Sequence, residues 1–95
     1  MALDLNYENN RIYSKSGDKL LAEIDFSEIS KNICNISRTF VDESLRGQGI
    51  ADKLMFLACE KIRESNKKAY PTCSYAISWF KKHPDYSDIY IDIME

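Results

Sequence analysis

The chain has 95 residues, of which 44% are hydrophobic and 12% are aromatic, and its formal net charge is -2 at pH 7. These values are typical of one globular domain over residues 1–95, and they argue against disorder and against a second domain. The nearly balanced charge gives no basic face for nucleic acid, and no apolar run is long enough to cross a membrane. We expect a monomer or weak dimer that binds neither nucleic acid nor membrane.

The cysteines and the first residues bear on the cellular compartment. Cys34, Cys59 and Cys73 are odd in number and show no Cys-x-x-Cys spacing, which argues against a disulfide framework and against a zinc site. The first six residues contain neither the basic region nor the apolar stretch of a signal peptide. Both observations favour a cytoplasmic protein without a metal.

The first 41 residues predict strands over 3–7, 11–13, 20–27 and 33–41, joined by short turns. The turn at residues 16–18 is the clearest, because its glycine accepts a positive φ without cost. In the third segment, alternate residues fall on two faces, with Leu20, Ala22, Ile24 and Phe26 on one and Glu23, Asp25 and Ser27 on the other. This period of two predicts a half-buried strand in an antiparallel meander.

The pattern becomes helical from Gly49 to about Ser65, where apolar residues recur at intervals of three and four. Phe56 falls among the polar positions of this helix and is interpreted as a single exposed aromatic, with cover by the C-terminal segment or by a partner as the alternative. A short strand is predicted over 69–73, and Pro71 should leave part of it unpaired because it has no N–H.

A second helix is predicted from about Tyr75 to Lys82, because Pro84 disfavours helical geometry at His83. Residues 89–91 can add a last short strand. The order of strands, helix, strand and helix predicts an α+β domain with a mostly antiparallel sheet and two helices.

The segment Arg46-Gly47-Gln48-Gly49 lies between the strand over 33–41 and the long helix. The first amides of a helix have no partner inside it, and the helix dipole adds partial positive charge there. Glycines let the backbone approach a phosphate, and Arg46 adds a cation with a planar set of donors. A pyrophosphate therefore suits this turn, although a glycine-rich turn that binds nothing has the same pattern.

Two motifs resemble the GNAT superfamily of acyltransferases. Its first pattern is Gln or Arg, two residues, Gly, one residue, and then Gly or Ala, and Arg46, Gly49 and Ala51 fit it between strand and helix. Its second pattern, Asn-x-x-Ala-x-x-x-Tyr, keeps its spacing and its alanine over residues 73–80, but both of its ends are changed. The resemblance covers about residues 20–91, and the chain is similar to a branch of compact, single-domain GNAT-like proteins.

The resemblance implies the GNAT-like (acyl-CoA N-acyltransferase) fold and a binding mode for acetyl-CoA. In this mode the pantetheine arm pairs with the backbone of Phe40 and Val41, in a V-shaped cleft between the fourth and fifth strands. The second helix, with Ser74 and Phe80, flanks the cofactor, and the thioester lies near Cys73. The diphosphate then contacts the backbone amides of the loop, which belong to Arg46, Gly47, Gln48, Gly49, Ile50 and Ala51.

The chain departs from the family at two catalytic positions. Many GNAT enzymes have a tyrosine acid where this chain has Phe80, and the compact branch often has a histidine where this chain has Arg38. By strand alternation, Arg38 shares an apolar face with Ile36 and Phe40. We interpret it first as the partner of a carboxylate such as Asp25, and alternatively as a contact for the substrate or the oxyanion.

Cys73 is the candidate catalytic residue, because it replaces the asparagine of the second pattern and should lie beside the thioester. A thiolate there can take the acetyl group and pass it on, whereas the alternative is a small residue that fills the cleft floor. His83 is interpreted as a cap of the second helix, with a contact to the cofactor or substrate as the alternative. Trp79 and Tyr75 are interpreted as core aromatics, with an acceptor pocket as the alternative.

Three functions follow as hypotheses. The first is an acetyl-CoA-dependent N-acetyltransferase that acts on a small amine, a polyamine or a protein lysine. The second is a module that binds CoA or acetyl-CoA with little or no transfer, and the third is a structural domain whose loop binds nothing. The chain is short for this superfamily, and we therefore expect a shallow site on the acceptor side.

Overall fold

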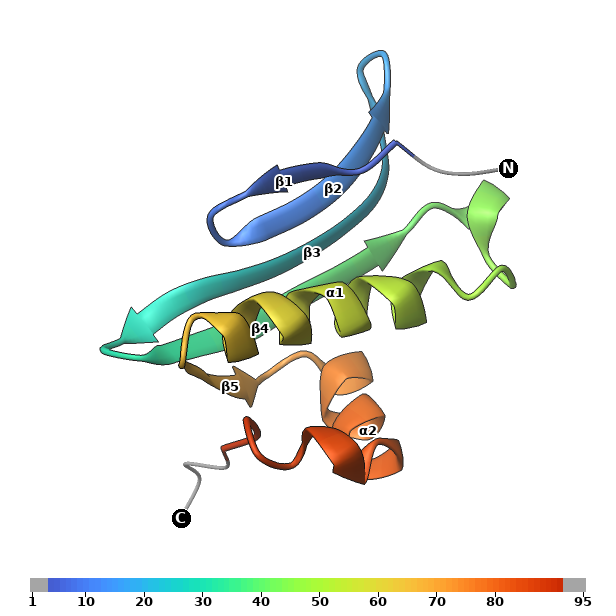
Figure 1. The fold of residues 1–95 in the computed structure, drawn as a ribbon. Coiled ribbons are helices and arrows are strands. Elements are labelled where there is room, and N and C mark those ends of the chain that lie inside the picture. The colour runs from blue at the N-terminus through green and yellow to red at the C-terminus, as the bar shows by residue number, and fades with distance from the viewer. Residues whose placement is uncertain (1–3, 92–95) are drawn as a thin grey trace.

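The computed structural model describes residues 4–91. In it, five strands form one sheet and two α-helices pack against that sheet (Figure 1). The strands are β1 Asn6–Glu8, β2 Arg11–Ser16, β3 Lys19–Ser30, β4 Ile33–Val41 and β5 Lys68–Pro71, and the helices are α1 Ile50–Glu64 and α2 Ser74–Lys82. Short 3-10 helices, η1 Glu43–Leu45 and η2 Pro84–Tyr86, follow β4 and α2. The predicted strand over 3–7 begins outside the described residues.

The sheet has the order β1-β2-β3-β4-β5. The first four strands are antiparallel neighbours, and β5 pairs with β4 in parallel after the crossover through α1. The mostly antiparallel α+β architecture predicted from the sequence is therefore confirmed. Residues 89–91 add a single bridge beside β5, in which the N–H of Ala69 donates to the carbonyl of Ile89 over 2.7 Å.

The core lies between α1 and one face of the sheet. Three residues of the predicted apolar face of β3 are confirmed, since Ala22, Ile24 and Phe26 are at most 2% exposed. The fourth, Leu20, is only partly buried, because the pairing with β2 skips Leu21 and breaks the alternation there. From α1, the buried side chains are Leu54, Met55, Ala58, Cys59 and Ile62. We call the opposite face, which carries Glu23 and Asp25, the outer face.

Phe56 is not an isolated exposed aromatic, so the preferred prediction was wrong, and the alternative of cover by the C-terminal segment is the one observed. Its ring packs edge-on against Trp79 and His83, with centroids 5.1 and 5.3 Å apart, and lies 5.8 Å from Tyr86. The helix pattern alone places Phe56 among polar neighbours, but α2 and η2 cover that side of α1. No helix among residues 4–91 is long and apolar enough to cross a membrane.

Candidate functional site

The glycine-containing loop begins where β4 ends. The N–H of Asp42 donates to Leu21 of β3 over 2.8 Å, and its carboxylate accepts from the N–H of Ser44 over 3.1 Å, so the loop starts from a fixed point. Gly47 and Gly49 have φ values of 86° and 74°, in the left-handed region that favours glycine. The chain enters α1 directly after Gly49, as the sequence predicts.

A hollow of about 160 Å³ lies inside this turn, and we call it the loop hollow. It gathers six of the predicted cofactor-binding residues, while Gln48 is not among its lining residues. The lining consists of Val41, Leu45, Arg46, Gly47, Gly49, Ile50, Ala51, Asp52 and Tyr75. A Cβ added at either glycine of the loop would meet no atom within 4 Å, so the backbone there faces open space.

The loop hollow has the features that an anion requires. The first amides of α1 have no acceptor inside the helix, because the helical ladder begins with the bond from Lys53 N–H to Gly49 O. Arg46 is exposed, and its Nε donates to the carbonyl of Val41 over 3.3 Å. The carboxylate of Asp52 is turned to the Nε1 of Trp79, at 2.7 Å. A phosphate group therefore fits this hollow.

Beside the loop, β4 loses its neighbour part of the way along its length. Its parallel pairing with β5 ends at Ile36 and Pro71, and the next two amides, of Thr72 and Cys73, both donate to Ile36 O, at 3.0 and 3.3 Å. β4 continues to Val41, so residues 37–41 have no partner on this side among the described strands. We call this point the fork.

Cys73 lies at the fork, as predicted. It is half-buried, it precedes α2 as the N-cap residue, and its Sγ lies 3.6 Å from the Oγ1 of Thr39. Among residues 4–91, no imidazole or carboxylate is hydrogen-bonded to it. The other two cysteines are buried, as predicted, and burial raises the pKa of the Cys59 thiol to about 12.

A second hollow of about 560 Å³, which we call the helix hollow, adjoins the first. It is lined by Asp52, Ser74, Tyr75, Ser78, Trp79, Lys82 and His83. Asp52 and Tyr75 line both hollows, and Tyr75 is 39% exposed, which disagrees with a core position. Asp52 was not among the predicted site residues, because an acidic residue in the first turn of a helix is the usual complement to its dipole.

The predicted residues of α2 separate into two groups. Ser74 lines the helix hollow, whereas Phe80 is only 7% exposed and packs against Trp79 and Tyr90, with ring centroids 5.4 and 5.1 Å away. His83 is the residue that ends α2, as predicted, and it stacks on Trp79 at 3.9 Å.

Arg38 lies on the outer face, not on the face of Ile36, and that part of the prediction was wrong. Phe26 pairs with Ile36 and Asp25 pairs with Arg38, so Ser37 is an extra residue in β4. This β-bulge reverses the alternation of side chains beyond it. Phe40, which pairs with Glu23, is also on the outer face, and Thr39 is on the core face.

The predicted ion pair of Arg38 exists, but its partner is Glu23 instead of Asp25. Arg38 Nε donates to Glu23 Oε1 over 2.8 Å, and Arg11 Nε donates to the other oxygen of the same carboxylate. Burial acts to raise the pKa of Glu23, but the hydrogen bonds from the two guanidinium groups outweigh it and lower the pKa. The pKa of Asp25 is raised by burial and by the charge of Glu23.

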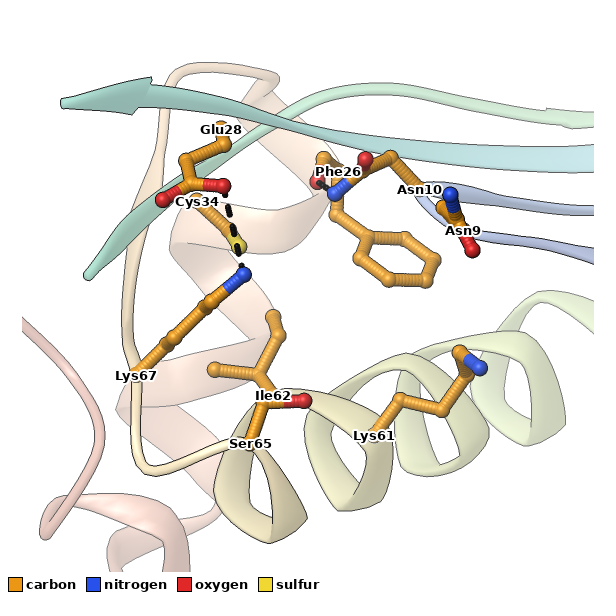
Figure 2. Close-up of a pocket in the computed structure, with 9 residues that line it drawn as sticks. All are labelled: Asn9, Asn10, Phe26, Glu28, Cys34, Lys61, Ile62, Ser65 and Lys67. Carbon is orange, nitrogen blue, oxygen red and sulfur yellow. Dashed lines mark hydrogen bonds and ion pairs between the residues drawn. The ribbon is translucent and has the colours of Figure 1, made fainter. Parts of the chain in front are cut away.

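A further hollow of about 280 Å³ lies at the other end of α1, between that helix and the β3–β4 hairpin (Figure 2). Lys67 Nζ lies 3.2 Å from Glu28 Oε1 beside Cys34, and Phe26 and Ile62 form the floor. None of the residues predicted to bind the cofactor lines it.

Comparison with known proteins identifies a family model and relatives that match this sequence. The sequence model of the GCN5-related N-acetyl-transferase family matches residues 11–89. Protein NATD1 of Gallus gallus and of Mus musculus is 32% identical over 59 residues, which are 62% of this chain and 54% of those proteins. For Protein NATD1 of Homo sapiens the identity is the same and the covered share is 52% of that protein. The chain thus spans about half the length of these relatives.

The solved structures agree with the predicted fold. A GCN5-like protein from Staphylococcus aureus, a proposed N-acetyltransferase, superimposes with a TM-score of 0.81 at 32% identity, over 98% of this chain and 92% of that one. Ard1 from Thermoplasma volcanium gives a TM-score of 0.60 at 23% identity, over 78% of this chain and 53% of that one, which is a likeness of fold alone. The predicted GNAT-like fold is confirmed.

Proposed function

Because the chain belongs to the GCN5-related N-acetyltransferase family, we propose that it binds acetyl-CoA and transfers the acetyl group to an amine. One observation carries the proposal: Val41 ends the unpaired stretch of β4 and also lines the loop hollow. A single extended ligand can therefore pair with the strand edge and continue directly onto the loop. CoA has this shape, since an extended pantetheine arm leads to a diphosphate.

The loop residues hold the anionic end of the ligand. The amides of residues 47–51 would donate to the diphosphate, whereas the backbone N–H of Arg46 already donates to Glu43 O over 3.3 Å. The Arg46 side chain would exchange the carbonyl of Val41 for a phosphate oxygen, which is the stronger, charge-assisted acceptor. Phe40 and Val41 supply backbone groups along the edge. Ser74 borders the ligand from α2, and Phe80 supports that helix from its buried side.

When bound, acetyl-CoA supplies a thioester whose carbonyl carbon bonds to a neutral amine as the C–S bond breaks, so that the amine loses a proton and the thiolate gains one. The contribution of the chain is to position groups beside the thioester: at the fork, the Sγ of Cys73 lies 3.6 Å from the Oγ1 of Thr39. If Cys73 acts covalently, its thiolate bonds to the acetyl carbon, CoA leaves as the thiol, and the amine then displaces Cys73. Otherwise the amine attacks directly.

A binding module with little transfer is the second candidate. It is favoured by Phe80, which has no hydroxyl and is 7% exposed, and by Arg38, which occupies the position where the compact branch often has an imidazole. Neither residue can move a proton at neutral pH.

The affinity for acetyl-CoA, measured by isothermal titration calorimetry, tests the proposed function. Gly49→Trp should weaken binding at least roughly ten-fold, because the indole fills the hollow that a phosphate would occupy. Gly17→Trp is the matched control, since Gly17 also has a positive φ of 59° and open surroundings, but it lies in the β2–β3 turn. Equal affinities in the two variants would remove the loop from the proposal.

A further inference from the structure

The outer face carries hydrogen-bond donors next to the fork. Asn35 pairs with Ser27 of β3 and Tyr70 of β5, and its Oδ1 accepts a 2.8 Å hydrogen bond from the hydroxyl of Thr72. In this orientation the Nδ2 of Asn35 is left to donate. Beyond the bulge at Ser37, Arg38 also lies on this face, opposite Asp25.

The guanidinium of Arg38 is held in place with its outer nitrogens free. Its Nε is bonded to Glu23, its Cζ lies 5.4 Å from the ring centroid of Phe40, and its side chain is 52% exposed. Neither Nη group has a hydrogen-bond partner within residues 4–91. Arg11 is different, because it lies within 4 Å of Glu8 and of Asp25 in addition to Glu23.

These donors lie across the β4 backbone from Cys73. Arg38 and Thr39 are consecutive residues on opposite faces of β4, and Thr39 is the contact of the Cys73 sulfur. The proposed thioester therefore has core-face residues on one side and the exposed Arg38 on the other. An acceptor that approaches from the outer face would meet the side of β4 that carries Arg38 and Asn35.

We propose that the acetyl acceptor carries a carboxylate close to its amine, and that Arg38 and Asn35 bind this carboxylate on the outer face. This inference rests on the proposed function and selects among its acceptors. A guanidinium fork matches a carboxylate in charge and shape, whereas a polyamine or a lysine side chain brings only positive charge towards it. The acceptor class is thus an amino acid, and Arg38 determines specificity.

Two matched sets of acceptors test the inference: glycine, glycinamide and methylamine, and 4-aminobutyrate, 4-aminobutanamide and butylamine. In at least one set, we expect kcat/KM, calculated per neutral amine, to be roughly ten- to hundred-fold higher for the carboxylate compound than for its amide and amine analogues. This is the factor that one hydrogen bond to a charged group contributes. A second readout needs no turnover, because the same carboxylate should shift the Nε–Hε NMR signal of Arg38 and its amide analogue should not.

Variants show which residues cause the preference for the carboxylate acceptor. Arg38→Gln should abolish the preference, and Lys15→Gln, which removes an exposed charge at the end of β2, should keep it. Asn35→Ala should reduce the preference while the Arg38–Glu23 pair stays intact, so the inference can be tested even if Arg38→Gln does not fold.

The outcomes separate the two proposals. Equal kcat/KM across each set, or an Arg38 signal that carboxylates do not move, would overturn the inference and leave acetyl transfer standing. Failure of the wild-type chain to bind acetyl-CoA, measured first by calorimetry, would overturn the proposed function and the inference with it.

Discussion

Trp79 Nε1 donates a 2.7 Å hydrogen bond to Asp52 Oδ1, and this bond joins α2 to the first turn of α1. His83 stacks on the same indole and places its Nδ1 2.7 Å from the carbonyl of Trp79. Since Asp52 lines both hollows, the bond also fixes the wall that they share.

The hydrogen bond between Asp52 and Trp79 should be measurable as a coupling energy in the free energy of unfolding. We expect Asp52→Ala and Trp79→Phe each to lower the free energy of unfolding, with a coupling energy of about 1 kcal/mol, as for a partly exposed hydrogen bond. Urea unfolding of the two single variants and the double variant gives this energy. Additive effects would mean that the bond contributes nothing to stability.

Tyr86 makes the stability depend on alkaline pH. Its hydroxyl donates to Glu60 Oε2 over 2.7 Å, and this bond, with burial, raises the pKa of Tyr86 from its usual value of 10.0 to about 12. A raised folded-state pKa contributes stability that is fully present below pH 10 and is lost as pH rises towards about 12. Urea unfolding at increasing pH should show this loss in the wild type. Tyr86→Phe should show a smaller loss, and identical slopes would contradict the assignment.

Glu23 should control the acid side of the stability profile. Because its folded-state pKa is lowered, its contribution is present above the usual value of 4.5 and is lost as pH falls through the folded-state pKa. Glu23→Gln should flatten this part of the profile. At neutral pH, Glu23→Ala should cost about 1 to 2 kcal/mol, because it removes the shared carboxylate of Arg11 and Arg38, while water can solvate the two partly exposed guanidinium groups. Glu43→Ala, in the exposed η1 segment, is the control that should change little.

Cys73 can be tested by intact mass after incubation with acetyl-CoA and no acceptor. If Cys73 takes the acetyl group, the wild type and Cys59→Ala should both gain one acetyl group, and Cys73→Ala should gain none. The buried Cys59 is the control for adventitious acetylation. An adduct that persists in Cys73→Ala, or no adduct on a wild type that retains acetyl-CoA, would exclude the covalent route.

Much of the fold could be predicted because local patterns agree with the packing. The two-residue period of β3 survives over residues 22–26, as does the three-to-four spacing of α1, and Gly17 has the positive φ expected of its turn. Six residues of the loop hollow could also be predicted, since a glycine-rich turn before a helix is a local feature.

The errors arose where distant segments meet. Strict alternation places Arg38 on the face of Ile36, because the bulge at Ser37 leaves no signal in the sequence. No glycine marks the bulge, and Ser37 and Arg38 are both polar, so the change of face does not alter the pattern. Phe56 was read as exposed because a helix pattern contains no information about α2. Asp52 was missed because its partner, Trp79, lies 27 positions further along the chain.

The fork is made of main-chain atoms. Proline at position 71 has no N–H, and the two amides that follow it converge on the one carbonyl of Ile36. The separation of β4 from the chain beside it therefore does not depend on the side chains of Arg38, Thr39 or Cys73. Point mutations at these three positions can replace the reactive groups while the opening between the strands persists. The scaffold is thus suited to diversification, in nature or by design, towards other acceptors and other acyl chemistry.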